Sequence, residues 1–516
     1  MASFNENDRR DVLPNWRSYK ETSCAGEFNA STNTQYSIPL FSLDEYIFAW
    51  KEHRGVPFAA DLVSAAITNG QTNNPEVIEA ASFIKNHPDD CSNTQLLCAK
   101  RVLPEEESKD SENHLELNNK LCFLKDKETH YRESIRILKQ QNIKYPYNAI
   151  NYCELARYYA NIGQLEKAKS MMEIAVYLAP SSRFISRSAA RLFTHLNDLD
   201  RAHKVLVNNP WISRDPWIIA SEIAVNSLRG RNSRYVKRGK DIILSGNYHP
   251  FSYSEMASAI GTLEMQNGSR KSCRNFMNIA LKRPNDNSLA QAEWIIYENK
   301  DLLLNFGDYE YLTKKAEADC RYAYSKDEFT AALNSGIDWI ADYPFDPHPI
   351  YFSAGMAYTF IKDYQTAIDI INLGLRANPN DAGLLNNLAY CYALSGNVEK
   401  AETILNRTDL KIMSISNETK ICLIATRGLV EYRKGQIENG YKLYLKAITY
   451  AKELGCEKSF IEKAMLNFIR EEVIANPAYD RGLLSLIDDI EIVDKETRQL
   501  KIDIITYLNG KSVGRL

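Results

Sequence analysis

The sequence lacks the short motifs that carry common enzymatic chemistry. Its 516 residues contain no GxxxxGK[ST], no GxSxG, no HExxH and no GxGxxG between a strand and a helix. Each of these motifs sets a nucleophile, a base, a metal ligand or a phosphate-binding loop at a fixed spacing. Their absence argues against those enzyme classes. We therefore predict a protein that is not an enzyme and that needs no cofactor.

Cysteine pairs and metal-ligand clusters are also missing. The ten cysteines include no CxxC pair, and none of the eight histidines stands beside a carboxylate at metal-ligand spacing on one helix. This argues against the usual zinc sites, so we predict no bound metal. Four cysteines fall inside helical patterns, where cysteine behaves as a small buried apolar residue, as in a reducing compartment: Cys153, Cys273, Cys391 and Cys422.

Long hydrophobic runs and a dominant charge are absent too. No stretch of about 18 apolar residues occurs, and the N-terminus shows no apolar signal region. The net charge is −3, from 63 basic and 66 acidic residues, so the overall field favours neither nucleic acid nor membrane. We expect a cytoplasmic protein without membrane contact.

What the sequence does contain is a helical period, clearest over residues 149–182. Large residues recur at the i, i+3, i+7 spacing of one helix face: Tyr152, Leu155 and Tyr159. Gly163 can adopt the backbone angles of a tight turn, and Pro180 cannot continue a helix. Small and apolar residues between them predict a second helix packed closely on the first: Ala168, Met172 and Ala175.

This pattern resembles the 34-residue tetratricopeptide repeat, and in-register copies follow over 348–381, 382–405 and 421–454. One helix pair cannot bury its outer face alone, so each copy implies neighbours. The resemblance implies an all-α fold, a right-handed solenoid of stacked antiparallel helix pairs. Such repeats serve many unrelated pathways, so the resemblance is specific for the fold rather than for one function.

The pattern divides the chain into four parts. Residues 1–40 are polar without a sustained period and are expected to form an irregular N-terminal arm. Residues 41–145 contain N-terminal helical repeats with an acidic linker near 104–119. A tetratricopeptide-like array is expected over 146–475. Residues 476–516 form C-terminal capping helices, because the tail is amphipathic and acidic.

The family usually binds ligands on a concave groove lined by the first helix of each pair. In the N-terminal part, the positions that the family turns toward this groove are basic: Arg157, Arg187, Arg191 and His195. Arginine matches carboxylate or phosphate in geometry, so these residues predict a clamp for such a group on a partner. Alternatively, the arginines pair with acidic residues of neighbouring repeats, of which Glu154 and Glu173 are candidates.

The same positions in the C-terminal part are aromatic, apolar or amide residues: Phe352, Met356, Phe360, Asn386, Asn387, Tyr390 and Tyr432. Asn387 stands where family members often use asparagine to hold a peptide backbone. An amide both donates and accepts hydrogen bonds, so it can pair with an extended chain of any sequence. Alternatively, Phe352 and Phe360 pack against the adjacent repeat.

Basic residues gather in the region 183–240. Residues 181–240 hold 12 Lys and Arg against 4 Asp and Glu. Six of these basic residues lie in one run, which is a possible contact for an anion or nucleic acid: Arg229, Arg231, Arg234, Lys237, Arg238 and Lys240. More often, such a run is solvated or meets an acidic partner surface.

The sequence thus predicts a non-enzymatic protein–protein interaction scaffold, or adaptor, that binds a partner segment in a concave groove. Three alternatives stay open. One is a regulatory or inhibitory subunit of a partner enzyme or toxin, into which the arm of residues 1–40 could thread. Another is a nucleic-acid-binding scaffold that uses residues 183–240. The third is an enzyme within the weakly patterned residues 1–145, although that stretch has the pattern of helix pairs rather than of a catalytic fold. The sequence also leaves open whether the chain's own termini fill the groove.

Overall fold

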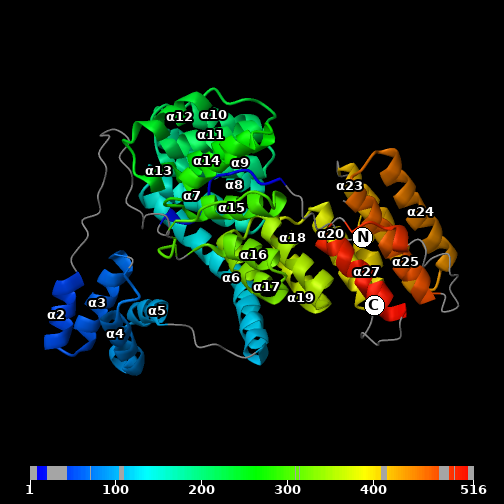
Figure 1. Cartoon of the computed structure of the whole chain (residues 1–516), viewed down its shortest axis with the longest axis horizontal. Coiled ribbons are helices and arrows are strands. Elements are labelled where there is room, and N and C mark those ends of the chain that lie inside the picture. The colour runs from blue at the N-terminus through cyan, green and yellow to red at the C-terminus, as the bar shows by residue number, and fades with distance from the viewer. Residues whose placement is uncertain are drawn as a thin grey trace.

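The computed structural model describes residues 9–19, 43–69, 71–103, 110–307, 309–312, 314–407, 415–475, 487–492 and 494–508. Over these residues the chain folds into helices, turns and irregular segments, without a strand (Figure 1). The predicted all-α fold of stacked helix pairs is confirmed.

A small helical module precedes the array. Its elements are α2 (Leu43–Glu52), α3 (Val56–Asn69), α4 (Pro75–Asn86), η1 (Pro88–Asp90) and α5 (Asn93–Val102). Trp50, Leu62 and Ile84 are fully buried in its core. The side chain of Asn74 accepts a hydrogen bond from the Glu76 amide and so caps α4. These helices match the pairs expected from the sequence.

Helix α6 (Asp110–Lys144) is longer than expected and corrects the predicted linker of residues 104–119. Residues 110–119 are helical, and residues 104–109 lie outside the described part. Leu117, Leu121 and Leu124 are buried against the array, at the spacing of one helix face. This apolar stripe explains the helix, because acidic residues are tolerated near a helix N-terminus.

The array itself consists of helix pairs joined by short turns. Its first half contains α7 (Ala149–Asn161), α8 (Leu165–Leu178), α9 (Arg183–His195), α10 (Leu199–Val207), α11 (Pro216–Leu228), α12 (Val236–Ser245), α13 (Pro250–Gln266), α14 (Arg270–Ala280), α15 (Asp286–Glu298), α16 (Ala316–Ser325) and α17 (Phe329–Asp342). The second half contains α18 (Pro347–Gly355), η2 (Met356–Ile361), α19 (Tyr364–Ala377), α20 (Ala382–Leu394), α21 (Val398–Leu405), α23 (Asn417–Arg433), α24 (Ile437–Glu453) and α25 (Lys458–Ala475).

The array curls until its first turn meets a helix far along the chain. Gly163, between α7 and α8, has φ +70°, and a Cβ there would lie 2.8 Å from the carbonyl oxygen of Arg376 at the end of α19. The guanidinium of Arg376 donates to the carbonyl oxygens of Leu124 (3.0 Å) and Lys125 (2.9 Å) in α6. The first pair, α6 and α19 are therefore held together.

The last described helix, α27 (Lys495–Leu508), folds back on the array and packs against α25 and η2. Its buried residues Leu500 and Ile504 join those of α25 in one apolar cluster. Figure 1 shows α27 beside α20 and α25. Among the described helices, none combines the length and apolar character needed to cross a membrane.

Candidate segment-binding site

Residues 9–19 lie against helices α7, α11, α15, α16 and α17 of the array, and we call these residues the N-terminal segment. Residues 9–18 have no regular secondary structure. Val12, Pro14 and Trp16 are buried, whereas Leu13 and Asn15 between them are partly exposed. Burial of every second residue is the pattern of an extended chain. We call the surface that receives this segment the inner face, formed by residues of α7, α11, α15, α16 and α17.

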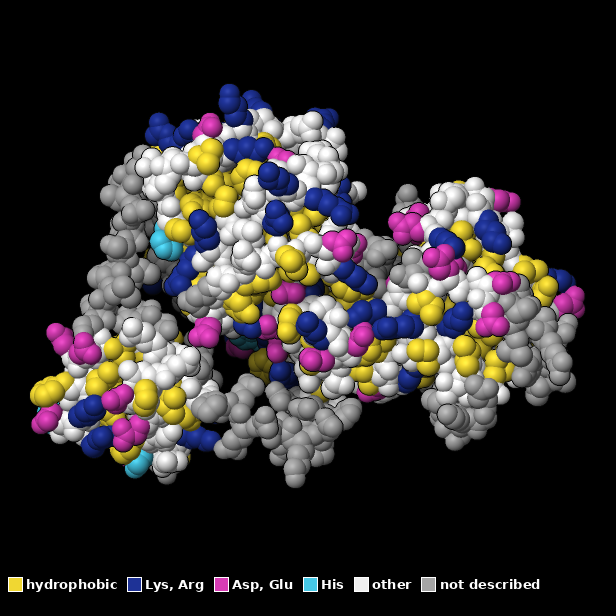
Figure 2. Space-filling model, in the orientation of Figure 1, with side chains coloured by type: hydrophobic (Ala, Val, Ile, Leu, Met, Phe, Trp, Pro, Cys, Tyr) yellow, Lys and Arg dark blue, Asp and Glu magenta, His cyan; other side chains and the backbone are white. Residues whose placement is uncertain are grey.

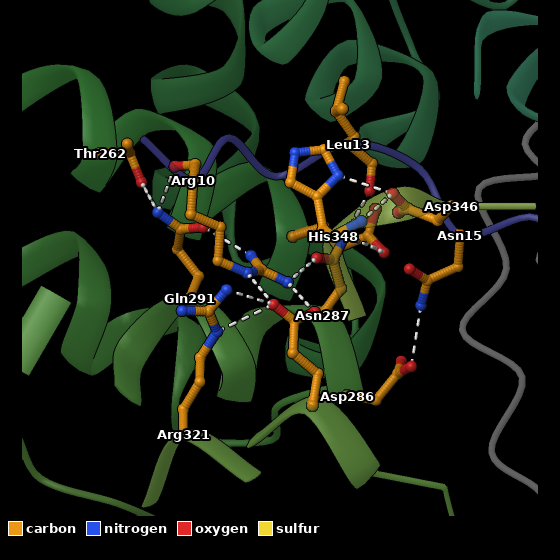
Figure 3. A network of polar contacts seen from close by, with 12 residues as sticks. Arg10, Leu13, Asn15, Thr262, Asp286, Asn287, Gln291, Arg321, Asp346 and His348 are labelled. Atoms are coloured by element: carbon orange, nitrogen blue, oxygen red, sulfur yellow. Dashed lines mark hydrogen bonds and ion pairs between the residues drawn. The ribbon is translucent and has the colours of Figure 1, made fainter. Parts of the chain in front are cut away.

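Arg10 of the segment enters a polar pocket between α15 and α16 (Figure 3). Its guanidinium donates to both carboxylate oxygens of Glu317, at 2.7 and 2.8 Å. It also donates to the side-chain oxygens of Asn287 (2.9 Å) and Gln291 (2.5 Å). Such a two-pronged ion pair is stronger and more directional than a single contact.

The charges in this pocket hold each other in the ionised form. Burial alone would raise the pKa of Glu317, but the neighbouring Arg10 and Arg321 outweigh it and lower that pKa to about 2. Burial likewise opposes the charge of Arg10, yet Glu317 raises the pKa of Arg10 above its ordinary value. Arg321 on the same helix as Glu317 also pairs with this carboxylate at 2.9 Å, so Arg10 adds a second cation to it.

Arg17 occupies a second acidic pocket. Its Nη2 lies 2.7 Å from a carboxylate oxygen of Asp286 and 3.0 Å from one of Asp342. The guanidinium also lies over the ring of Tyr343, with its carbon 5.2 Å from the ring centroid. The neighbouring Asn15 donates to Asp286 at 2.8 Å. Two carboxylates therefore share one arginine of the segment.

Between the two arginines, Trp16 anchors the segment in the apolar core. It is 1% exposed, and its ring centroid lies 5.2 Å from that of Phe345. The His195 ring meets the other side of this aromatic group, 5.4 Å from Phe345. Burial lowers the pKa of His195 to about 4, so the imidazole is neutral near pH 7. Large buried aromatic side chains contribute most to such contacts.

Side chains of the inner face also pair with the backbone of the segment. Asn287 donates to the carbonyl oxygen of Leu13 at 2.7 Å, and Gln291 donates to that of Arg10 at 3.0 Å. A carboxylate oxygen of Glu154 accepts from the Tyr19 amide at 2.7 Å. Asn287 and Gln291 are one turn apart on α15. They make the kind of backbone contact that the sequence predicted for Asn387.

The basic residues predicted to form a clamp are engaged within the chain. Arg157 pairs with Glu154 at 2.9 Å, and Arg187 pairs with Glu255 at 2.8 Å. Arg191 pairs with Asp346, and His195 is part of the aromatic group described above. Pairing with acidic residues, the alternative reading, is thus what the structure shows. The two candidates from the sequence differ from that expectation, since Glu154 pairs with Arg157 of its own helix and Glu173 pairs with Arg201.

The charge of the inner face therefore differs from the basic charge expected for the groove. The sequence predicted a basic groove for an acidic ligand, but the carboxylates of the inner face hold a basic segment. The physical reason is that Arg187 and Arg191 are neutralised by carboxylates from distant helices. Capture of an external carboxylate or phosphate by these arginines stays a prediction.

The residues predicted for the C-terminal groove lie inside the helical stack. Phe360 stacks on Phe329, with centroids 3.9 Å apart, and Phe352 meets Tyr324 at 5.3 Å. These contacts are the adjacent-repeat packing that the sequence left as the alternative. The remaining predicted residues are also buried: Met356, Asn386, Asn387, Tyr390 and Tyr432.

Helices α23 and α25 supply the partners of these buried residues. Asn386 accepts a hydrogen bond from Thr426 at 2.9 Å, and its amide donates to Asn387 at 3.2 Å. The Tyr390 hydroxyl donates to Asn467 at 2.9 Å, and that of Tyr432 donates to Glu472. Partner binding through these residues stays a prediction, and it would require α25 to move.

The basic run of residues 229–240 is exposed but partly paired. Figure 2 shows Lys and Arg side chains over the end of the molecule that carries α10 to α12. Arg229 pairs with Asp200 at 2.6 Å, and Lys240 pairs with Glu264 at 2.7 Å. Arg238 donates to a backbone carbonyl oxygen, and Arg234 lies over the Tyr235 ring. Arg231 and Lys237 are exposed. Nucleic-acid contact here stays a prediction.

The sequence analysis missed the residues that receive the segment: Asp286, Asn287, Gln291, Glu317 and Asp342. They lie in 286–342, a stretch whose repeat pattern is irregular. A signal was nevertheless present in the segment, since Val12, Pro14 and Trp16 alternate between two arginines. In the part of the chain that the structure describes, no group of His, Cys, Asp and Glu is arranged to hold a metal ion.

Comparison with known families agrees with the repeat geometry. Residues 149–182 and 362–412 each match a tetratricopeptide repeat model. The chain therefore carries tetratricopeptide repeats in these two stretches. Repeats of this family generally mediate protein interactions. No curated protein matches the sequence.

The solved structures that match the chain share little sequence with it. A human IFIT1 dimer with m7Gppp-AAAA is 13% identical, with 98% of this chain and 99% of that chain covered and a TM-score of 0.26. Yeast Tom70 is 14% identical, with 78% of this chain and 96% of that chain covered and a TM-score of 0.30.

Proposed function

We propose that this tetratricopeptide-repeat protein is an adaptor that binds an extended segment of a partner protein on its inner face. In this proposal, the chain's own N-terminal segment occupies the site that the partner segment would bind. The single observation that carries the proposal is the way residues 9–19 are held. Side chains of four helices, α7, α15, α16 and α17, contact them through the backbone and two arginines, and one tryptophan of the segment is buried.

The contacts follow a common mode of peptide recognition. Hydrogen bonds to the main chain hold an extended peptide, and pockets for alternate side chains select its sequence. Asn287 and Gln291 supply the main-chain contacts, and the burial of Val12, Pro14 and Trp16 supplies the alternate pockets. The segment is therefore bound as a ligand would be bound.

An occupant from the same chain competes strongly with an external one. A tethered segment has an effective concentration in the millimolar range, so it lowers the apparent affinity of a partner. The partner must bind tightly, or the segment must first be loosened. An adaptor that restrains a partner enzyme would use the same site, and loss of the partner's activity in the complex would identify that case.

The test uses the full-length chain with Trp16→Ala and Arg17→Ala, here called the loosened variant. The probe is a fluorescent peptide with the sequence of residues 9–19, and its binding is measured by anisotropy. We expect saturable binding that is at least about tenfold tighter to the loosened variant than to the wild-type chain, because the tethered competitor is weakened.

The control removes the main-chain contacts in the loosened background with Asn287→Ala and Gln291→Ala. We expect weaker probe binding, with the thermal unfolding of the array retained. If hydrogen exchange shows that residues 9–19 have left the inner face of the loosened variant, and the probe still does not bind, the adaptor proposal is wrong.

A further inference from the structure

The inner face is acidic at the two places where the N-terminal segment is basic. Glu317 faces Arg10, and Asp286 with Asp342 faces Arg17. These three carboxylates are at most 18% exposed, and the two arginine side chains are 10% and 11% exposed. Such shielded charges need partners, because a buried charge that loses its partner is costly.

The first pocket distinguishes arginine from lysine. Four acceptor oxygens surround the guanidinium of Arg10: two from Glu317 and one each from Asn287 and Gln291. Arginine presents five donors in a planar fork, whereas lysine is a compact point charge with three donors. An ammonium group therefore leaves part of this acceptor set without a donor.

The second pocket couples charge with an aromatic anchor. Arg17 follows Trp16 directly, so an extended chain turns one side chain into the core and the next toward Asp286 and Asp342. The buried Pro14 has no amide donor that would need an acceptor, and its ring restricts the chain to extended conformations. The spacing between the two arginines is fixed by the positions of α15, α16 and α17.

From these contacts we infer that the partner segment is a basic, extended peptide. It carries two arginines seven positions apart and a tryptophan directly before the second, as in Arg-x-x-x-x-x-Trp-Arg. This inference rests on the proposed function, because it names the ligand class of the same site. The N-terminal segment is then an internal copy of the ligand, which blocks the inner face until a matching segment replaces it.

The test compares labelled probe peptides on the loosened variant. The parent probe has the sequence of residues 9–19, and the altered probes carry Arg10→Lys, Arg10→Glu or Trp16→Ala. A comparison probe carries Arg9→Ala, because the Arg9 side chain is 47% exposed and its contact with the inner face is a hydrogen bond to Ser227. We expect about tenfold weaker binding for Arg10→Lys, and about thirtyfold or more for Arg10→Glu and Trp16→Ala. The Arg9→Ala probe should lose less affinity than any of these, because the Arg9 side chain is half exposed.

A charge exchange provides an independent readout. The loosened variant with Glu317→Arg should not bind the parent probe and should bind the Arg10→Glu probe. If this variant fails to fold, Glu317→Gln takes its place and should bind the parent probe more weakly. Equal binding of all probes, or preference for an acidic probe, would overturn the inference while leaving the adaptor proposal intact. Failure of the parent probe to bind the loosened variant would overturn both.

Discussion

The two halves of the array are filled by different occupants. In the half that contains α7 to α17, the N-terminal segment lies on the inner face through ion pairs, amide contacts and one tryptophan. In the half that contains α18 to α25, helix α27 packs on α25 and η2 through an apolar cluster and buried charges. The first occupant has polar contacts that another segment could reproduce, whereas the second continues the helical stack.

This difference indicates which surface can exchange its occupant. Helices α25 and α27 share a core, so removing α27 exposes apolar side chains and buried charges together. Residues 9–18 of the segment have no regular secondary structure, so the segment can leave without a helix of the stack being removed. The exchangeable site is therefore expected in the N-terminal half.

The largest expected effect tests how firmly α27 is held on the array. Lys463 lies 2.9 Å from Asp494 and 2.8 Å from Glu496, and all three side chains are at most 9% exposed. Lys463→Met leaves two buried carboxylates without a cation and should cost about 3–5 kcal/mol in the free energy of unfolding. Urea unfolding measures this cost. Lys458→Met, at a lysine 65% exposed on the same helix, should leave the midpoint unchanged.

The next effect concerns the aromatic group under Trp16. Burial, together with the charges of Arg191 and His348, lowers the pKa of His195 to about 4, although Asp346 and Asp381 oppose this. The unfolded chain binds a proton at about pH 6.5, so stability is full above that pH and falls as the pH drops toward 4. The loss should approach roughly 3 kcal/mol. His195→Gln should remove this dependence of the free energy of unfolding on pH, measured by unfolding at several pH values. An unchanged dependence would show that His195 is not its source.

A smaller effect tests the contact between the turn at Gly163 and the end of α19. Gly163→Ala adds strain at a positive φ and brings a Cβ to 2.8 Å from the Arg376 carbonyl oxygen. We expect a cost of about 2 kcal/mol. Gly435 has φ +79° with nothing within 4 Å of its Cβ position, so Gly435→Ala reports the strain alone and should cost less. Equal losses in thermal unfolding would show that the contact with α19 is unimportant.

The smallest effect measures one polar contact of the segment. Asn15 donates to Asp286 at 2.8 Å. Asn15→Ala should weaken the segment's hold by about 1 kcal/mol, because Asp286 keeps Arg17 as a partner. Hydrogen exchange of residues 12–17 should then be several times faster. Exchange that stays at the wild-type rate would show that this hydrogen bond contributes nothing.

The helical period sufficed to predict the repeats, but not what they hold. Tyr159, Gly163 and Ala168 follow local rules of spacing, so the pair of residues 149–182 was recognisable. The pairing of Arg191 with Asp346 joins residues that are distant in sequence, and no local pattern indicates it. The prediction of a basic clamp did not take such long-range contacts into account. Likewise, composition concealed the helical stripe of Leu117 and Leu121 within the acidic stretch.

The most direct test of the account is hydrogen exchange on the wild-type chain before and after excess peptide of residues 9–19 is added. The account predicts that the chain's own segment, distinguished from the peptide by an isotope label, loses protection because the peptide replaces it. Helices α25 and α27 should keep theirs. If the segment stays protected at saturating peptide, or if it loses protection only together with α27, the inner face does not exchange its occupant and the central claim is wrong.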